Sequence, residues 1–298
     1  MRNFNTEATS VLTSAVQLRH ATVEDADICG RICYEAFAAI SSQHNFTPDF
    51  PAPEASAGLL RMLFSHSGFY CVVAQCDGRI VGSNCLDERS TIAGIGPVTV
   101  APDVQNRSIG RLLMQSVIDR ARERGFPGAR LLQAAYHNRS LSLYTKLGFD
   151  PREPMSVMQG TPLKRSIEGC AVRPAGESDI EAANRVCERV HGHNRSGELR
   201  DGIGQGTALV VERHGRITGY ASAFGYFGHA VGESNVDLQA LIAAADGFGG
   251  PGIIVPTRNS DLFRWCLERG LQVVHPMTLM TIGLYNEPVG AYLPSVLY

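Results

Sequence analysis

The chain has 298 residues, of which 44% are hydrophobic and 19% are charged, and its formal net charge is −2. This composition is typical of a folded globular protein and excludes a chain that is disordered throughout. The near-neutral charge gives no electrostatic basis for binding nucleic acid or an anionic membrane surface, and no apolar run reaches the length of a membrane-spanning helix.

The first 15 residues contain no apolar stretch of the kind found in a secretory signal, and they predict a short flexible tail. Eight cysteines are scattered through apolar segments, and none forms a C-x-x-C pair. Such cysteines are typical of buried free thiols in a reducing compartment, so we expect a cytoplasmic protein without a structural metal. The eight are Cys29, Cys33, Cys71, Cys76, Cys85, Cys170, Cys187 and Cys266.

A strand, a polar turn and a helix follow one another after Pro97. The β-rich run Pro97 to Val100 is broken by Ala101-Pro102-Asp103, and an amphipathic helix follows a short polar loop. Free backbone N–H groups and the positive end of the helix dipole meet at the start of this helix, which predicts a site for an anion such as a pyrophosphate. The apolar face of the helix is predicted to contain Ile109, Leu112, Leu113, Val117 and Ala121.

This loop carries a family resemblance. Gln105-x-x-Ser108-x-Gly110 resembles the coenzyme A loop of the GNAT superfamily of acyl-CoA N-acyltransferases, which is usually Gln/Arg-x-x-Gly-x-Gly/Ala. Ser108 replaces the first glycine of that pattern.

A second motif lies downstream, in the order that the family requires. The segment from His137 to Phe149 resembles the family's N-x-x-A-x-x-(L/F)-Y-x-x-x-G-F helix. Ser140 stands in the alanine position and Tyr144 in the tyrosine position, while His137 replaces the usual asparagine and Asn138 follows one place later. The resemblance covers residues 18 to 160.

The resemblance implies that acetyl-CoA is the co-substrate. Backbone N–H groups from Gln105 to Arg111 would hold its pyrophosphate, with charge from Arg107 or Arg111, and the Val100 N–H would polarise the thioester carbonyl. The implied cofactor-binding residues are Val98, Thr99, Val100, Gln105, Asn106, Arg107, Ser108, Ile109, Gly110, Arg111, Asn138, Ser140 and Tyr144.

Tyr144 is the candidate general acid for the coenzyme A thiolate, and the plainer alternative is a tyrosine packed beside its helical neighbours. The general base is less defined, because residues 92 to 100 contain no carboxylate. Glu88, with Asp87 beside it, is the nearest candidate; both also fit solvated charges of a hairpin. His137 can serve as a base, take the place of the asparagine or simply pack.

The amine acceptor is expected over the first two helices and the loop between them, residues 41 to 54. This loop is long, proline-rich and aromatic, which suits a substrate lid. Asp49 and Glu54 would attract a cationic amine, while Phe46 and Phe50 would pack on an apolar one. Docking of this loop on the second half of the chain is the alternative.

The second half repeats the first in three pairs of segments. The two members of each pair predict the same local structure: a strand that leads into a helix, a hairpin turn, or a helix end followed by a strand. The fold is therefore predicted to occur twice. The pairs are residues 18–25 with 172–179, 77–82 with 214–219, and 146–158 with 268–280.

The second copy lacks the chemistry of the first. Nothing near its predicted helix, residues 234 to 245, resembles the phosphate loop, and Cys266 stands in the tyrosine position. We therefore expect four segments: a flexible tail (residues 1–15), an active domain (16–160), a linker (161–169) and a degenerate domain (170–298).

The predicted fold class is α/β (α+β), with two tandem GNAT-like domains, each a mixed and mostly antiparallel sheet flanked by helices. The function implied by the resemblance is transfer of an acetyl group from acetyl-CoA to a primary amine of a small molecule or a peptide. A non-catalytic acyl-CoA sensor is the alternative. The chain is expected to be a monomer with an internal pseudo-dimer, or a homodimer, with no nucleic-acid or membrane partner.

Overall fold

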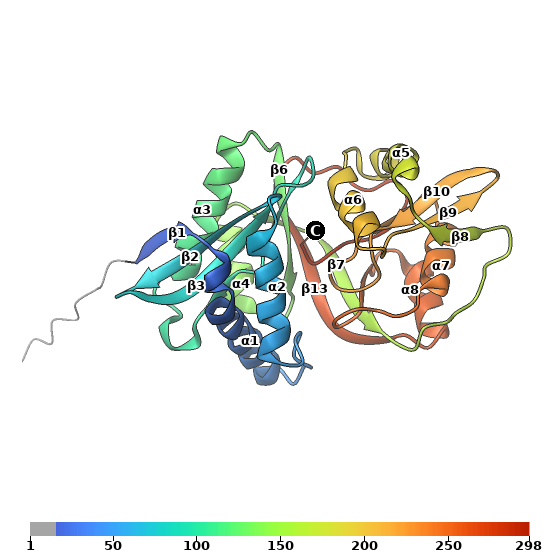
Figure 1. Ribbon diagram of the computed structural model, residues 1–298. Coiled ribbons are helices and arrows are strands. Elements are labelled where there is room, and N and C mark those ends of the chain that lie inside the picture. The colour runs from blue at the N-terminus through green and yellow to red at the C-terminus, as the bar shows by residue number, and fades with distance from the viewer. Residues whose placement is uncertain (1–15, 298) are drawn as a thin grey trace, which may run out of the picture.

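A computed structural model describes residues 16–297, so the predicted tail at residues 1–15 lies outside the described residues. The two halves of the chain form two lobes, which meet along the long strands β7 and β13 (Figure 1). Each lobe contains a mixed or antiparallel sheet with helices packed against it, which confirms the predicted α/β architecture.

The first lobe has helices on both faces of its sheet, because side chains alternate along each strand. On β2, Val72 and Ala74 join the core beneath α3, whereas Cys71 and Val73 join the core beneath α1 and α2. The strands are β1 (Gln17–His20), β2 (Phe69–Cys76), β3 (Arg79–Asp87), β4 (Ala93–Ile95), β5 (Thr99–Val100), β6 (Gly128–Ala134) and β7 (Asp150–Gln159). The helices are α1 (Ala26–Gln43), α2 (Pro53–Ser65), α3 (Ile109–Glu123) and α4 (Asn138–Lys146).

The apolar face of α3 differs from the predicted one at a single position. Leu113, Val117 and Ala121 are buried as expected, but Leu112 is 41% exposed. Residues 109, 113, 117 and 121 follow one i, i+4 row, and Met114 and Ile118 widen it on the side away from Leu112. The prediction that Leu112 belongs to the buried face is therefore wrong.

The second lobe repeats this order of elements. Its predicted helix at residues 234–245 is confirmed as α7, which Ser234 and Asp237 begin with a capping box. The strands are β8 (Ala171–Pro174), β9 (Leu209–Arg213), β10 (Arg216–Ala221), β11 (Ala230–Gly232), β12 (Ile253–Pro256), β13 (Gln272–Gly283) and β14 (Ala291–Leu293). The helices are α5 (Ile180–His191), α6 (Ser196–Gly204), α7 (Asn235–Ala244) and α8 (Ser260–Glu268).

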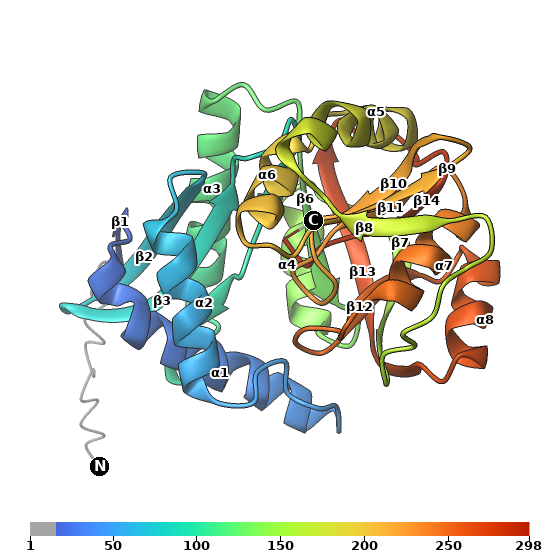
Figure 2. The same ribbon diagram turned by 45° about the vertical axis from the view of Figure 1, so that its right-hand side comes forward.

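The two copies exchange strands at the centre of the molecule. β13 of the second copy lies between β6 and β7, and β7 of the first copy lies between β13 and β12 (Figure 2). The register places Leu279 opposite Leu132 on β6, and Val157 of β7 opposite Ile254 on β12. One sheet therefore runs through both copies, and each copy completes the sheet of the other.

Two of the eight cysteines are not free, which corrects the sequence prediction. Cys71 and Cys85 are directly opposite in the register of β2 and β3 and form a disulfide. The other six are free, and burial raises the pKa of Cys29 to about 12. Among the described residues, no group of His, Cys, Asp and Glu side chains is arranged to hold a metal ion. No helix in this part of the chain is long and apolar enough to cross a membrane.

Candidate active site

The site begins where two neighbouring strands separate. β4 pairs in parallel with β6 only at Ala93 and Gly94, and β5 pairs with β3 alone. Between β4 and β5 the chain turns at Gly96, whose φ of 140° favours glycine. The separation of β5 from β6 opens a cavity of about 680 Å³.

The free edge of β5 faces this cavity. The Ala101 N–H donates to the Val81 carbonyl of β3 at 2.9 Å, and consecutive N–H groups of a strand point in opposite directions. The Val100 N–H therefore points away from β3, toward the gap. The Val100 carbonyl accepts a hydrogen bond from Gln105 Nε2 at 3.1 Å, so the loop after β5 is tied to the strand.

The loop before α3 has an unusual backbone. Asn106 and Ser108 have φ values of 66° and 63°, in the left-handed region, and Ser108 is the N-cap of α3. No side chain caps this helix start, so the first-turn N–H groups remain available to a ligand. This loop is also held from α4, since Arg139 donates to Gln105 Oε1 at 3.1 Å and to Asn106 Oδ1 at 3.4 Å.

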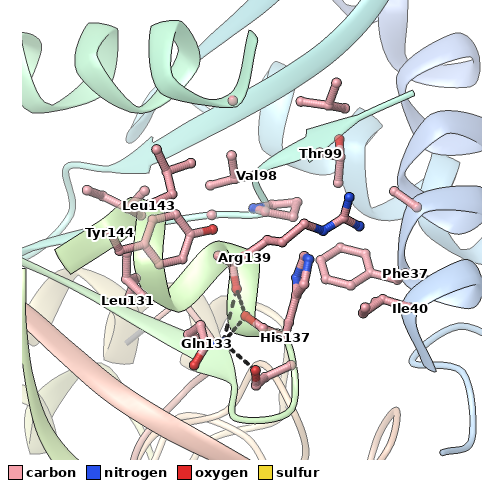
Figure 3. Close-up of a pocket in the computed structure, with 18 of the residues that line it drawn as sticks. Phe37, Ile40, Val98, Thr99, Leu131, Gln133, His137, Arg139, Leu143 and Tyr144 are labelled. Atoms are coloured by element: carbon pink, nitrogen blue, oxygen red, sulfur yellow. Dashed lines mark hydrogen bonds between the residues drawn. The ribbon is translucent and has the colours of Figure 1, made fainter. Parts of the chain in front are cut away.

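Polar contacts fix the start of α4 on the opposite wall. Gln133 of β6 donates to the His137 carbonyl at 2.9 Å and to Ser140 Oγ at 3.0 Å (Figure 3). Burial and the neighbouring Arg139 lower the pKa of His137 to about 4, so the imidazole is neutral at pH 7.

Tyr144 lies in the same wall. Its ring is placed between Leu131 and Leu143, and its hydroxyl points into the cavity (Figure 3). Burial raises the pKa of this phenol to about 12, so it keeps its proton at neutral pH.

Most of the predicted cofactor-binding residues meet in this cavity. Arg107 is the exception, since it does not line the cavity. Those that line it are Val98, Thr99, Val100, Gln105, Asn106, Ser108, Ile109, Gly110, Arg111, Asn138, Ser140 and Tyr144.

The structure does not bring Glu88 to the cavity. Its carboxylate accepts from Arg120 of α3 at 2.7 Å, and Asp87 is paired with Arg89 at 2.6 Å. Neither carboxylate is placed to take a proton from an acceptor, because each lies outside the cavity and is held by a guanidinium.

The other end of the cavity is built by both copies. Asp49 and Phe50 come from the loop between α1 and α2, as the sequence indicated, whereas Glu54 is exposed on α2 and does not line the cavity. Tyr226 and Met277 reach it from the second copy. No local sequence signal marks these two residues, because Met277 lies on the exchanged strand β13 and Tyr226 lies in a loop of the other copy.

The chain end also reaches this site. Leu297 lies against β4 so closely that a Cβ on Gly94 would be 1.9 Å from the Leu297 carbonyl oxygen. Val296 donates its N–H to the Tyr226 carbonyl at 2.7 Å, and both Val296 and Leu297 line the cavity. The C-terminal residues therefore close one side of the cavity.

Comparison with known proteins agrees with this geometry. Residues 37–149, which include the separated strands, the loop and α4, match the acetyltransferase (GNAT) family. The chain contains a GNAT domain. A curated relative, mycothiol acetyltransferase of Nocardia farcinica, is 37% identical over 65 residues, which are 22% of this chain and 22% of that protein.

Solved structures show that the GNAT fold extends over both copies. A putative acetyltransferase from Pyrococcus horikoshii has a TM-score of 0.74 at 18% identity and covers 97% of each chain. A GCN5-related N-acetyltransferase from Sphaerobacter thermophilus has a TM-score of 0.59 at 17% identity, covering 91% of this chain and 96% of that one. A tandem GNAT protein from the clavulanic acid biosynthesis pathway has a TM-score of 0.53 at 12% identity, covering 90% and 98%.

In the second GNAT-like copy, the equivalent gap is filled by the chain itself. β14 pairs with β11, with Tyr292 opposite Val231, and so lies where a ligand would lie beside β5 in the first copy. The Asp237 carboxylate accepts from the Ser234 N–H at 2.9 Å and places a negative charge at the start of α7. Glu153, Glu287 and Arg258 line the remaining space, and Arg258 is paired with Glu287 at 2.9 Å. The added strand β14 and the carboxylate cap of α7 disfavour a pyrophosphate there.

Proposed function

We propose that this chain is an acetyl-CoA-dependent N-acetyltransferase that acetylates a primary amine, with its active site in the first copy. The division at residues 161–169, the degenerate second domain (170–298) and a cytoplasmic location belong to this proposal. The observation that carries it is a single cavity that combines a free strand edge, an uncapped helix start and the protonated Tyr144.

The cavity residues fit the two ends of coenzyme A. The free edge of β5 can pair with the amides of the pantetheine arm as an added strand would. The first-turn N–H groups of α3, together with Arg111 and Arg139, supply donors and positive charge for the pyrophosphate. The space beside Gly110 is open, since a Cβ there would meet only Leu143 and Val100, both at van der Waals distance.

The reaction requires two proton-handling steps around the attack of the amine. The amine nitrogen forms a bond with the acyl carbon while the bond from that carbon to sulfur breaks. The Val100 N–H donates to the carbonyl oxygen as negative charge develops on it. Tyr144 then gives its proton to the leaving thiolate and recovers one from the newly acylated nitrogen.

Calorimetric titration of the purified chain with acetyl-CoA tests the proposal. We expect one equivalent per chain, because the gap of the second copy is filled by β14. No binding would overturn the proposal, and two equivalents would contradict the degenerate second copy. The internal exchange of β7 and β13 also supports a monomer with an internal pseudo-dimer, which light scattering checks.

A non-catalytic acyl-CoA sensor is the second candidate. It is favoured by the ion pairs of Asp87 with Arg89 and of Glu88 with Arg120. These two carboxylates were the candidate general bases, and each is already held by a guanidinium. Release of coenzyme A thiol in the presence of an amine library separates the two functions. Stoichiometric binding without amine-dependent thiol release would favour the sensor.

A further inference from the structure

A buried carboxylate lies at the end of the cavity that the two copies share. Asp49 lines the cavity, yet its side chain is only 8% exposed. Its Oδ1 atom has no hydrogen-bond partner among the described residues. Burying a carboxylate without a cation is costly, so the position of Asp49 requires an explanation beyond packing.

The groups around Asp49 come from four elements and include no cation at neutral pH. His275 of β13 places Nε2 3.9 Å from Asp49 Oδ1, and its burial lowers its pKa to about 4. Tyr226, between β10 and β11, is near enough to lower the pKa of the carboxylate, and its hydroxyl donates to Met277 Sδ at 3.5 Å. Cys33 of α1 and Tyr136, which follows β6, also interact with Asp49, and each has a raised pKa.

Aromatic packing holds the loop that carries Asp49 against the second copy. Phe46 stacks on Tyr136 with ring centroids 4.4 Å apart, and both rings lie edge-on to His275. Phe50 packs against Phe37 of α1 at 6.3 Å. The loop is thereby fixed at the junction, and Asp49 is directed into the cavity.

We propose that Asp49 binds the ammonium group of the acceptor and removes its proton, and that Tyr226 and His275 of the second copy complete this part of the active site. This inference rests on the proposed acetyltransferase function. It gives the degenerate copy a direct role in acceptor recognition.

The walls beside Asp49 define the acceptor class. Phe37, Ile40, Phe50, Phe227 and Met277 are apolar residues that line the same cavity as Asp49, and Asp49 is the only carboxylate in its lining. A lone negative charge in an apolar site selects one positive charge on an apolar body. The acceptor is therefore a small primary monoamine with an aromatic or branched aliphatic body, and a polyamine is disfavoured because its second charge has no partner.

The proton balance can be followed atom by atom. The acceptor enters as an ammonium ion and gives one proton to Asp49, which leaves a neutral amine to attack the acyl carbon. Tyr144 protonates the thiolate, and the second proton of the nitrogen restores Tyr144. Asp49 then releases its proton to solvent, so one proton is produced for each amide and each coenzyme A thiol.

Burial supports this role of Asp49 by raising its pKa to about 6, against the opposing effect of Tyr226. The higher pKa makes proton transfer from an ammonium ion roughly a hundredfold more favourable than transfer to an ordinary aspartate. At pH 7 the carboxylate is still mostly ionised, so it can accept the proton.

The test compares Asp49→Asn with wild type in the full chain. Binding of acetyl-CoA, binding of 2-phenylethylamine to the coenzyme A complex, and acetylation of 2-phenylethylamine, tyramine and 3-methylbutylamine are measured. We expect Asp49→Asn to keep the affinity for acetyl-CoA within twofold, to bind 2-phenylethylamine at least tenfold more weakly and to lose 10²- to 10⁴-fold in kcat. Binding of the neutral analogue 2-phenylethanol should not change.

The control variant is Asp27→Asn, the same substitution at an exposed carboxylate of α1, which should leave every value unchanged. A pH profile gives an independent readout. Wild-type kcat/KM should fall about tenfold per pH unit below pH 6, and His275→Asn should move the midpoint of this fall without changing acetyl-CoA affinity.

Three results would overturn the inference while leaving the proposed function intact. They are equal acetylation by Asp49→Asn and wild type, a preference for 1,4-diaminobutane over all three monoamines, or acetyl-CoA binding without binding or acetylation of any of the monoamines. Failure of wild type to bind acetyl-CoA would instead overturn the proposed function, and the inference with it.

Discussion

Arg139 of α4 donates to Gln105 of the loop before α3 at 3.1 Å, and Gln105 in turn donates to the Val100 carbonyl of β5. Three separate elements of the cavity wall are thus connected through two side chains. The equivalent place in the second copy has a different connection, in which Asn235 and Asn259 exchange hydrogen bonds of 2.9 and 2.7 Å between the starts of α7 and α8. The first copy therefore has the cation of Arg139 between its loop and α4, whereas the second copy has the neutral amides of Asn235 and Asn259.

Replacement of Arg139 by alanine is therefore expected to weaken acetyl-CoA binding. The variant removes a charged donor near the proposed pyrophosphate site and frees the loop, and each hydrogen bond to a charged group is worth about 1.5–3 kcal/mol. We expect Kd to rise about tenfold to a hundredfold, with partial recovery in Arg139→Lys, measured by calorimetry. Arg122→Ala, in an exposed part of α3, is the control. An unchanged Kd for Arg139→Ala would exclude this role.

Ser108 is expected to make the folded protein less stable than glycine would at the same position. Its φ of 63° costs about 1–2 kcal/mol for a residue with a Cβ, whereas glycine adopts it freely at an entropic cost of about 0.5–1 kcal/mol. We predict that Ser108→Gly raises the free energy of unfolding by about 0.5–1 kcal/mol in urea titrations. The matched change Ser142→Gly, inside α4, should lower it by a similar amount. Destabilisation by Ser108→Gly would show that the serine hydroxyl has a structural role.

The internal repeat and the backbone turn before α3 were predictable because both are local patterns. The paired segments at residues 18–25 and 172–179 adopt the same structure: Arg19 binds Asp25 at 2.6 Å, and Arg173 binds Asp179 at 2.7 Å. The glycine position held by Ser108 also proved to be a left-handed one. Such features depend on neighbouring residues, so the sequence alone contains them.

The exchange of β7 and β13 could not be predicted, because a buried strand has the same apolar pattern whichever sheet it joins. The end of the cavity near Asp49 is completed by Tyr226 and His275 of the second copy, and this long-range contact has no local sequence signal. The Cys71–Cys85 disulfide depends on the register of β2 and β3, which the spacing of cysteines does not reveal. Long-range pairing, and not local propensity, limited the prediction.

The repeated ion pairs predict an acid-sensitive stability. Hydrogen bonds from Arg19 and Arg173 lower the pKa values of Asp25 and Asp179 below their usual range. A carboxylate with a lowered folded-state pKa stabilises the fold above its unfolded pKa of about 3.9, and this contribution is lost as the pH falls toward the folded value.

We therefore expect the double variant Asp25→Asn/Asp179→Asn to be less stable than wild type by about 1–3 kcal/mol at pH 7. The difference should shrink as the pH falls below about 4. Urea unfolding at pH 7, 5, 4 and 3 measures it. A difference that stays constant from pH 7 to 3 would mean that the aspartates act through packing alone.

Tyr144→Phe separates chemistry from binding in the proposed mechanism. Phenylalanine keeps the packing of the ring beside Phe149, whose centroid is 6.3 Å away, and removes only the hydroxyl that points into the cavity. Because a general acid contributes about 10²- to 10⁴-fold, kcat should fall by that factor while the Kd for acetyl-CoA stays within twofold. The matched control is Tyr70→Phe. Tyr70 lies on β2, outside the cavity, with its ring beneath the Arg120 guanidinium, so this variant should leave kcat unchanged. If Tyr144→Phe retains wild-type kcat, the thiolate takes its proton from another donor, and Tyr144 only packs in the hydrophobic core beneath α3.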